Sequence, residues 1–153
     1  MKHVDNIRKL LRTMLASERF HALVVVSPPG WAKSTTIDAA IAELAVDHHA
    51  IGAYTTPLSL YNAICGHPSK LLVLDDCAGL FTDTKAMAVL KAATWPSVGA
   101  ERGGADGSRR VAWSSTSDKV TQAETVFAGK LVLLTNVLPG RADAQAFFSR
   151  TML

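Results

Sequence analysis

The chain has few cysteines and no long apolar run, and both absences limit what it can be. Its two cysteines, Cys65 and Cys77, are too few for a disulfide framework and lack the spacing of a zinc site. We expect both to be reduced, buried thiols of a cytoplasmic protein. No apolar run approaches the roughly 20 residues that a membrane-spanning helix needs. Residues 1–17 carry charges throughout, unlike a signal peptide, so we expect no membrane partner.

Charge is also modest in amount. Charged residues make up 19% of the chain and hydrophobic residues 48%, a balance typical of globular proteins. A net charge of +3 with a pI near 9.0 permits contact with nucleic acid but does not establish it. The length of 153 residues predicts one domain, 1–153, with a single sizeable core.

The spacing of apolar residues predicts helices that alternate with strands. Residues 5–18 have the period of an amphipathic helix. Further helices are predicted over 34–45, 57–65, 82–95 and 142–150, and strands over 22–27, 50–54, 71–74, 109–114 and 130–134. The polar segment 114–124 has no clear pattern. This alternation predicts an α/β protein with a parallel sheet.

One stretch between a predicted strand and a predicted helix has the pattern of a phosphate-binding loop. It consists of Ser27, Pro28, Pro29, Gly30, Trp31, Ala32, Lys33, Ser34 and Thr35. Backbone N–H groups at the start of the helix would hold phosphate oxygens, and the helix dipole favours an anion there. Lys33 would contact the β- and γ-phosphates, and the Ser34 hydroxyl would be a ligand of Mg²⁺.

The loop departs from the usual G-x-x-x-x-G-K-[ST] pattern at both glycines. Ser27 stands at the first glycine position and Ala32 at the second. Glycine is favoured where φ is positive or where the backbone approaches a ligand, so each replacement is expected to cost stability or affinity. The alternative is a Pro-Gly turn that happens to precede a lysine.

Two further strands end in polar side chains. The buried pattern of 71–74 ends in Asp75 and Asp76, and the apolar run from Lys130 ends in Thr135 and Asn136. In α/β proteins, ligands bind at the carboxyl ends of the parallel strands. Each group also has a plain alternative, in which carboxylates turn to solvent or an asparagine ends a strand before a turn.

The region before the last strand is a candidate for contact with nucleic acid. Four glycines fall within residues 99–107, which predicts a loop rather than a regular element. The candidate cations surround Trp113 and are Arg102, Arg109, Arg110 and Lys119. Cations would contact phosphates and an exposed aromatic ring could stack on a base. The alternative is a solvated loop with Trp113 in the core.

Three histidines are not expected to bind a metal. His48, His49 and His67 have no acidic or cysteine companions at ligand spacing, and we expect them at the surface or in loops.

In order and spacing, these motifs resemble the AAA+ class of P-loop ATPases over residues 20–150, with features of superfamily 3 helicases and mobile-element ATPases. The resemblance implies a three-layer αβα sandwich with strand order 5-1-4-3-2. It also implies that Asp75 holds Mg²⁺, Asp76 activates the attacking water, and Asn136 contacts that water or the γ-phosphate. Arg150 is placed like the arginine finger of a ring of several copies, such as a hexamer, with Arg141 as a rival. The chain ends where the class begins its helical lid, so the lid is expected to be absent.

Three functions are consistent with these patterns. The first is an Mg-ATP-hydrolysing ATPase that remodels or unwinds DNA. The second is a nucleotide-dependent binding switch with little hydrolysis, favoured by the altered loop and by the short Asp76 side chain. The third is a small-molecule P-loop kinase, which would need an arginine-rich lid, for which the glycine-rich stretch 99–110 is a candidate.

Overall fold

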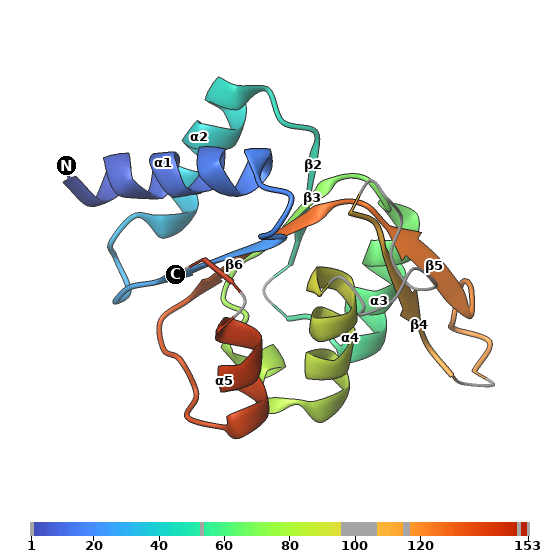
Figure 1. Cartoon of the computed structure of the whole chain (residues 1–153). Helices are drawn as coiled ribbons and strands as arrows, with labels where there is room; N and C mark the ends of the chain where they lie inside the picture. Colours follow the sequence, from blue (N-terminus) through green and yellow to red (C-terminus); the bar gives the residue numbers. More distant parts are fainter. Residues whose placement is uncertain (1, 53, 96–106, 115–116, 150, 153) are drawn as a thin grey trace.

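The computed structural model describes residues 2–52, 54–95, 107–114, 117–149 and 151–152 (Figure 1). The elements follow one another as α1 (Lys2–Ala16), β1 (Ala22–Val26), α2 (Lys33–Leu44), β2 (His48–Ile51), α3 (Pro57–Gly66), β3 (Leu71–Leu74), the 3-10 helix η1 (Ala78–Thr82), α4 (Thr84–Thr94), β4 (Arg109–Ala112), β5 (Glu124–Phe127), β6 (Lys130–Thr135) and α5 (Ala142–Phe148). The described chain is therefore a mixed α/β protein, as its sequence predicts.

Four strands form a parallel sheet in the order β1-β6-β3-β2 in the described part of the chain. The last of these strands in sequence, β6, lies in the middle, between β1 and β3. On its other side, β1 makes a single parallel bridge from Leu23 to Met152. Because the strands are parallel, the segments that leave β1, β3 and β6 all emerge at one edge of the sheet.

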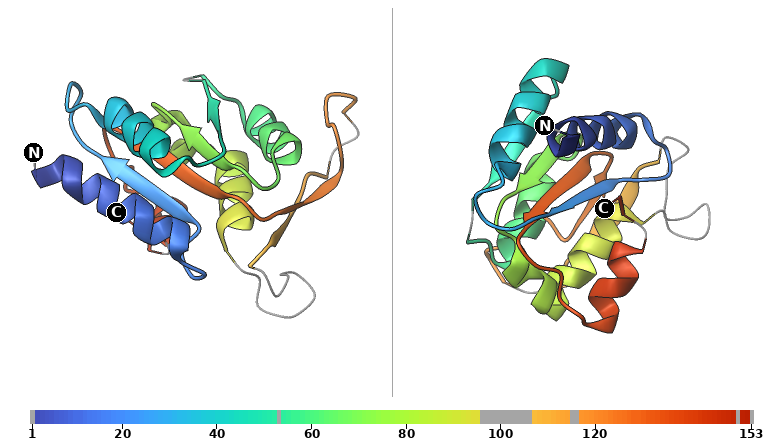
Figure 2. Two further views of the ribbon diagram at one scale, coloured as in Figure 1. Left: turned by 90° about the horizontal axis from the view of Figure 1, so that it is seen from above. Right: turned by 90° about the vertical axis from the view of Figure 1, so that its left-hand side faces the viewer.

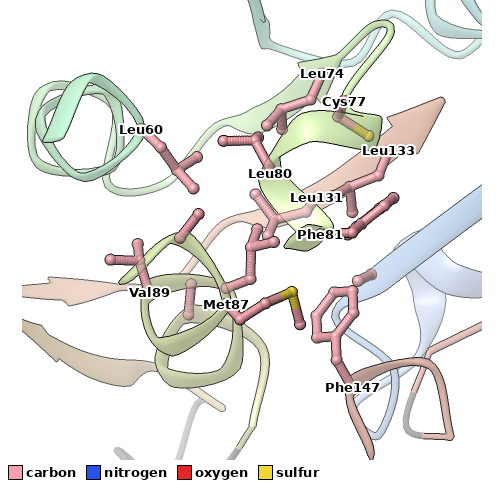
Figure 3. Close-up of a cluster of buried hydrophobic side chains, with 14 of the residues drawn as sticks. Leu60, Leu74, Cys77, Leu80, Phe81, Met87, Val89, Leu131, Leu133 and Phe147 are labelled. Carbon is pink, nitrogen blue, oxygen red and sulfur yellow. The ribbon is translucent and has the colours of Figure 1, made fainter. Parts of the chain in front are cut away.

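Helices cover both faces of this sheet (Figures 1 and 2). Successive strand residues point to opposite faces, so Leu23 and Val25 pack with α1 and α2, whereas Val24 packs with α3, α4 and α5. Figure 3 shows the second cluster, in which Leu131 and Leu133 of β6 face side chains from η1, α4 and α5. These two cores hold the sheet between two groups of helices.

Two helices begin at residues whose side chains cap the first turn. The Thr56 side chain accepts a hydrogen bond from the backbone N–H of Ser59, with Pro57 at the first helical position. The Asp83 carboxylate accepts from the backbone N–H groups of Lys85 and Ala86 at the start of α4. Each cap satisfies donors that would otherwise lack a partner in the first helical turn.

Other boundaries differ from the prediction. The N-terminal helix begins at Lys2 rather than at residue 5, and α5 ends at Phe148. Strand β2 covers His48–Ile51 rather than 50–54, because it pairs residue by residue with β3. The sequence predicts no element between residues 74 and 82, yet Leu80 and Phe81 are buried in η1. Strand β5 begins at Glu124, the last residue of the polar segment for which the sequence predicts no element. It pairs with β4 in an antiparallel hairpin.

Both cysteines are free thiols, as expected, but their surroundings differ. Cys77 is buried, and burial raises the pKa of its thiol to about 12. Cys65 is only half-buried. In the part of the chain that the structure describes, no helix combines the length and the apolar character that a membrane crossing requires.

Candidate functional site

Most of the predicted site residues meet at the carboxyl edge of the sheet. Lys33 begins α2 after the loop from β1, Asp75 and Asp76 follow β3, and Asn136 follows β6. They share a pocket of about 290 Å³. Its lining is Pro29, Gly30, Trp31, Ala32, Lys33, Ser34, Thr35, Asp75, Asp76, Leu134, Thr135 and Asn136. Three segments that are far apart in sequence therefore supply one pocket.

The loop after β1 has two residues with positive φ. Gly30 has φ of +82°, which glycine adopts without steric cost. Ala32, at the position where the pattern has glycine, has φ of 54° and ψ of 32°. The left-handed conformation costs an ordinary L-residue about 1–2 kcal/mol. Helix α2 begins directly after it, and Thr36 donates to the Ala32 carbonyl at 2.9 Å. The replacement of glycine by alanine thus leaves strain in the loop.

Lys33 is held inside the loop by three oxygens. Its Nζ donates to the carbonyls of Ser27 at 2.8 Å and Pro28 at 3.2 Å, and to Oδ1 of Asn136 at 2.7 Å. The lysine is only 9% exposed, whereas Asn136 is exposed. The contact with Asn136 joins the end of β6 to the loop after β1, as neighbouring parallel strands allow.

Ser34 and Asp75 also contact one another. The Ser34 hydroxyl donates to Oδ2 of Asp75 at 2.5 Å, and the backbone N–H of Asp76 donates to Oδ1 of Asp75 at 2.8 Å. Magnesium prefers oxygen ligands, carboxylates among them. The two side chains, one hydroxyl and one carboxylate, therefore offer oxygens of the kind that Mg²⁺ binds.

Asp76 differs from Asp75 in its backbone, although both carboxylates line the same two pockets. Its φ is 50°, in the left-handed region that costs a non-glycine residue energy. It lines both the phosphate-loop pocket and a second pocket of about 330 Å³ between the segments after β2 and β3. Asp76 is exposed just beyond the end of β3. The second pocket could not be foreseen, because its lining depends on the pairing of β2 with β3.

The sequence argument also missed an aromatic contact at the rim of the site. The rings of His3 and Trp31 lie 5.0 Å apart, so the first turn of α1 reaches the phosphate loop. Trp31 remains 53% exposed and lines the pocket. No local motif marks this contact, because it depends on how α1 packs on the sheet.

The structure corrects the role expected of Arg109. Its side chain is 1% exposed, and it donates to the carbonyls of Ala93 and Gly107 at 2.7 Å each and to the carbonyl of Gly129. A buried guanidinium with these partners ties β4 to α4 and to the turn before β6, and cannot contact nucleic acid. The signal was present in the sequence, because strand periodicity places Arg109 on the same face as the apolar Val111.

Arg109 also contacts His21, which is 4% exposed. The guanidinium lies 2.9 Å from Nδ1 of His21, so this nitrogen must accept and the ring must be neutral. Burial, and then the charge of Arg109, lower the pKa of His21 to about 4.

The other residues proposed for nucleic acid and for assembly are placed differently. Arg110 is exposed and pairs with Glu124 at 2.9 Å, and Lys119 is exposed. Trp113 packs against Tyr61 at the edge of the core, with ring centroids 5.6 Å apart. Arg102 and Arg150 lie outside the described residues.

Arg141, the rival arginine finger, and the three histidines not expected to bind a metal also lie in the described part of the chain. Arg141 pairs with Asp143 and donates to the Thr82 carbonyl, which holds it beside the start of α4. The rings of His49 and His67 stack with centroids 3.8 Å apart, and His48 is exposed.

Comparisons with known proteins give no family for this chain. No protein-family model matches it, and no curated protein matches it.

Proposed function

We propose that the chain binds Mg-ATP at the carboxyl edge of its sheet and hydrolyses it, in the manner of an AAA+-like P-loop ATPase. The observation that carries this proposal is the meeting of Lys33, the Ser34–Asp75 pair and Asn136 around one pocket. A cation, a metal-binding pair and a polar amide are the groups that phosphoryl transfer to water requires.

Each side chain has a role that follows from its position. The N-terminus of α2 and Lys33 bind the phosphates, since N–H groups and the helix dipole favour anions. Ser34 and Asp75 hold Mg²⁺, which when bound would neutralise charge on the phosphates. Asp76 accepts the proton of the attacking water, and Asn136 orients that water.

The strand order supports the AAA+-like assignment. When the parallel strands are numbered along the chain, their order is 1-4-3-2. Met152 bridges to the free side of β1, where the order 5-1-4-3-2 has its fifth strand. The helices on both faces are consistent with a three-layer αβα sandwich.

Assembly and partners follow from the same proposal. Arg150 of a neighbouring copy would complete the site in a ring, and hydrolysis would drive remodelling or unwinding of DNA. Of the four cations that the sequence suggests for DNA contact, Arg110 and Lys119 are the two that the structure describes as exposed. Turnover that rises more than linearly with protein concentration is the expected sign of a ring.

A nucleotide-dependent switch with little hydrolysis is the second candidate. It is favoured by the contacts of Lys33 with Asn136 and of Ser34 with Asp75, which occupy the groups that would bind Mg-ATP. It is also favoured by Asp76, which is one methylene shorter than the glutamate of most related ATPases.

ATP turnover tests the proposal and separates the two candidates. The purified chain would be assayed with Mg²⁺, with Mg²⁺ and single-stranded DNA, and with a chelator. We expect turnover that requires Mg²⁺ and rises with DNA. Binding of Mg-ATP without turnover would favour the switch, and the absence of binding would contradict both.

A further inference from the structure

The contacts of Lys33 leave it no free donor. A lysine ammonium has three N–H groups and no acceptor. In the structure, three oxygens lie within hydrogen-bond distance of Nζ: the carbonyls of Ser27 and Pro28, and Oδ1 of Asn136. A phosphate oxygen that binds this ammonium must therefore take the place of one of them.

The three acceptors are not equally easy to replace. The two carbonyls belong to the backbone of the loop, and Ser27 is fixed further because its N–H donates to the Thr135 carbonyl at 3.3 Å. Asn136 is an exposed side chain just beyond the end of β6, and rotation about its side-chain bonds can withdraw Oδ1 without moving the backbone. Its contact is nevertheless the shortest of the three, at 2.7 Å, so a phosphate that replaces it must compete with a well-formed hydrogen bond.

We propose that Asn136 is the group that a nucleotide phosphate displaces from Lys33, so that this side chain competes with the nucleotide and lowers its affinity. The inference rests on the proposed function, because it assumes that phosphates bind at Lys33. It adds a positioning role to Asn136. The amide that orients the attacking water becomes available for that task only after the phosphate has released it.

The test is calorimetric titration of ADP in the presence of a chelator, so that the Ser34–Asp75 pair and Mg²⁺ do not contribute. Asn136→Ala removes the competing oxygen and should bind ADP about tenfold more tightly, the effect of one hydrogen bond to a charged group. Asn136→Asp replaces the amide with a carboxylate that attracts the ammonium more strongly and repels phosphate. Its affinity should fall by about tenfold or more.

The control is Gln145→Ala, which also truncates an exposed amide but lies on α5, away from Lys33. Its affinity should equal that of the wild type. Turnover gives a second readout, since Asn136→Ala should lower both KM and kcat. A residue with a merely structural role would instead weaken binding in both Asn136 variants.

The outcomes separate the inference from the proposed function. Wild-type binding of ADP with equal or weaker binding by Asn136→Ala would overturn the competition while leaving the ATP site intact. Failure of the wild type and of every variant to bind ADP or Mg-ATP would overturn the proposed function and the inference with it. Opposite shifts in the Ala and Asp variants would support both.

Discussion

Replacing Ala32 with glycine tests the strained conformation of the phosphate loop. Ala32 has φ of 54°, in the left-handed region. This conformation is about 1–2 kcal/mol less favourable for an L-residue than the right-handed one. Glycine removes this strain. Glycine also gives the unfolded chain more conformational entropy, which offsets about 0.4–1 kcal/mol of the gain in stability. The difference predicts that Ala32→Gly raises the free energy of unfolding by about 0.5–1 kcal/mol.

Ala45 supplies a matched control within the same helix. It follows the last residue of α2 with φ of 51° and ψ of 41°, and it lies outside the phosphate pocket. Ala45→Gly should therefore stabilise the chain by a similar amount, in a position where helices often end in glycine. Urea titrations of the two variants and the wild type measure both effects.

Only the loop variant should also change nucleotide affinity. Ala32 lines the pocket, so loss of its methyl group lets a phosphate approach the backbone, whereas Ala45→Gly should leave ADP affinity unchanged. If Ala32→Gly destabilised the chain while Ala45→Gly stabilised it, the left-handed conformation of the loop would be refuted. Equal shifts in affinity in both variants would refute the proposed contact.

Two other variants probe chemistry and pH dependence. Asp76→Asn should keep the wild-type affinity for Mg-ATP and lose ATP turnover, measured as phosphate release; turnover at the wild-type rate would remove Asp76 from the mechanism. The pKa of His21 is about 4 in the folded chain, below the ordinary histidine value of 6.5 that the unfolded chain keeps, so the unfolded chain binds a proton first as the pH falls. Stability should therefore be lost between pH 6.5 and 4, by about 2–3 kcal/mol in total. His21→Gln should reduce this loss in urea titrations at a series of pH values, and an unchanged slope would show that His21 is not its source.

The sequence predicted the buried strands and the candidate site because their signals are local. Runs such as 71–74 are apolar on both faces, as central parallel strands must be, and polar residues at their ends mark the edge where ligands bind. The spacing could not predict that Lys33 touches Asn136. That contact requires β6 to lie beside β1, which is a property of the sheet order.

The errors have physical causes as well. Strand β2 alternates exposed and half-buried residues, so its ends are set by pairing with β3 rather than by its own composition. Strand β5 follows a polar segment and is fixed by its partner β4. Arg109 is a candidate for contact with nucleic acid in the sequence, although its strand position faces the core, where carbonyl groups accept its hydrogen bonds.

Calorimetric titration of Mg-ATP into the wild type and Lys33→Ala tests the central claim most directly. Lys33 is the cation of the pocket that faces the phosphate site, and its removal should weaken binding by at least about thirtyfold. Lys9→Ala, which removes an exposed lysine on α1, should bind like the wild type. Saturable binding by the wild type and its loss in Lys33→Ala alone is the predicted result. Equal affinity in all three proteins would contradict the assignment of the phosphate loop.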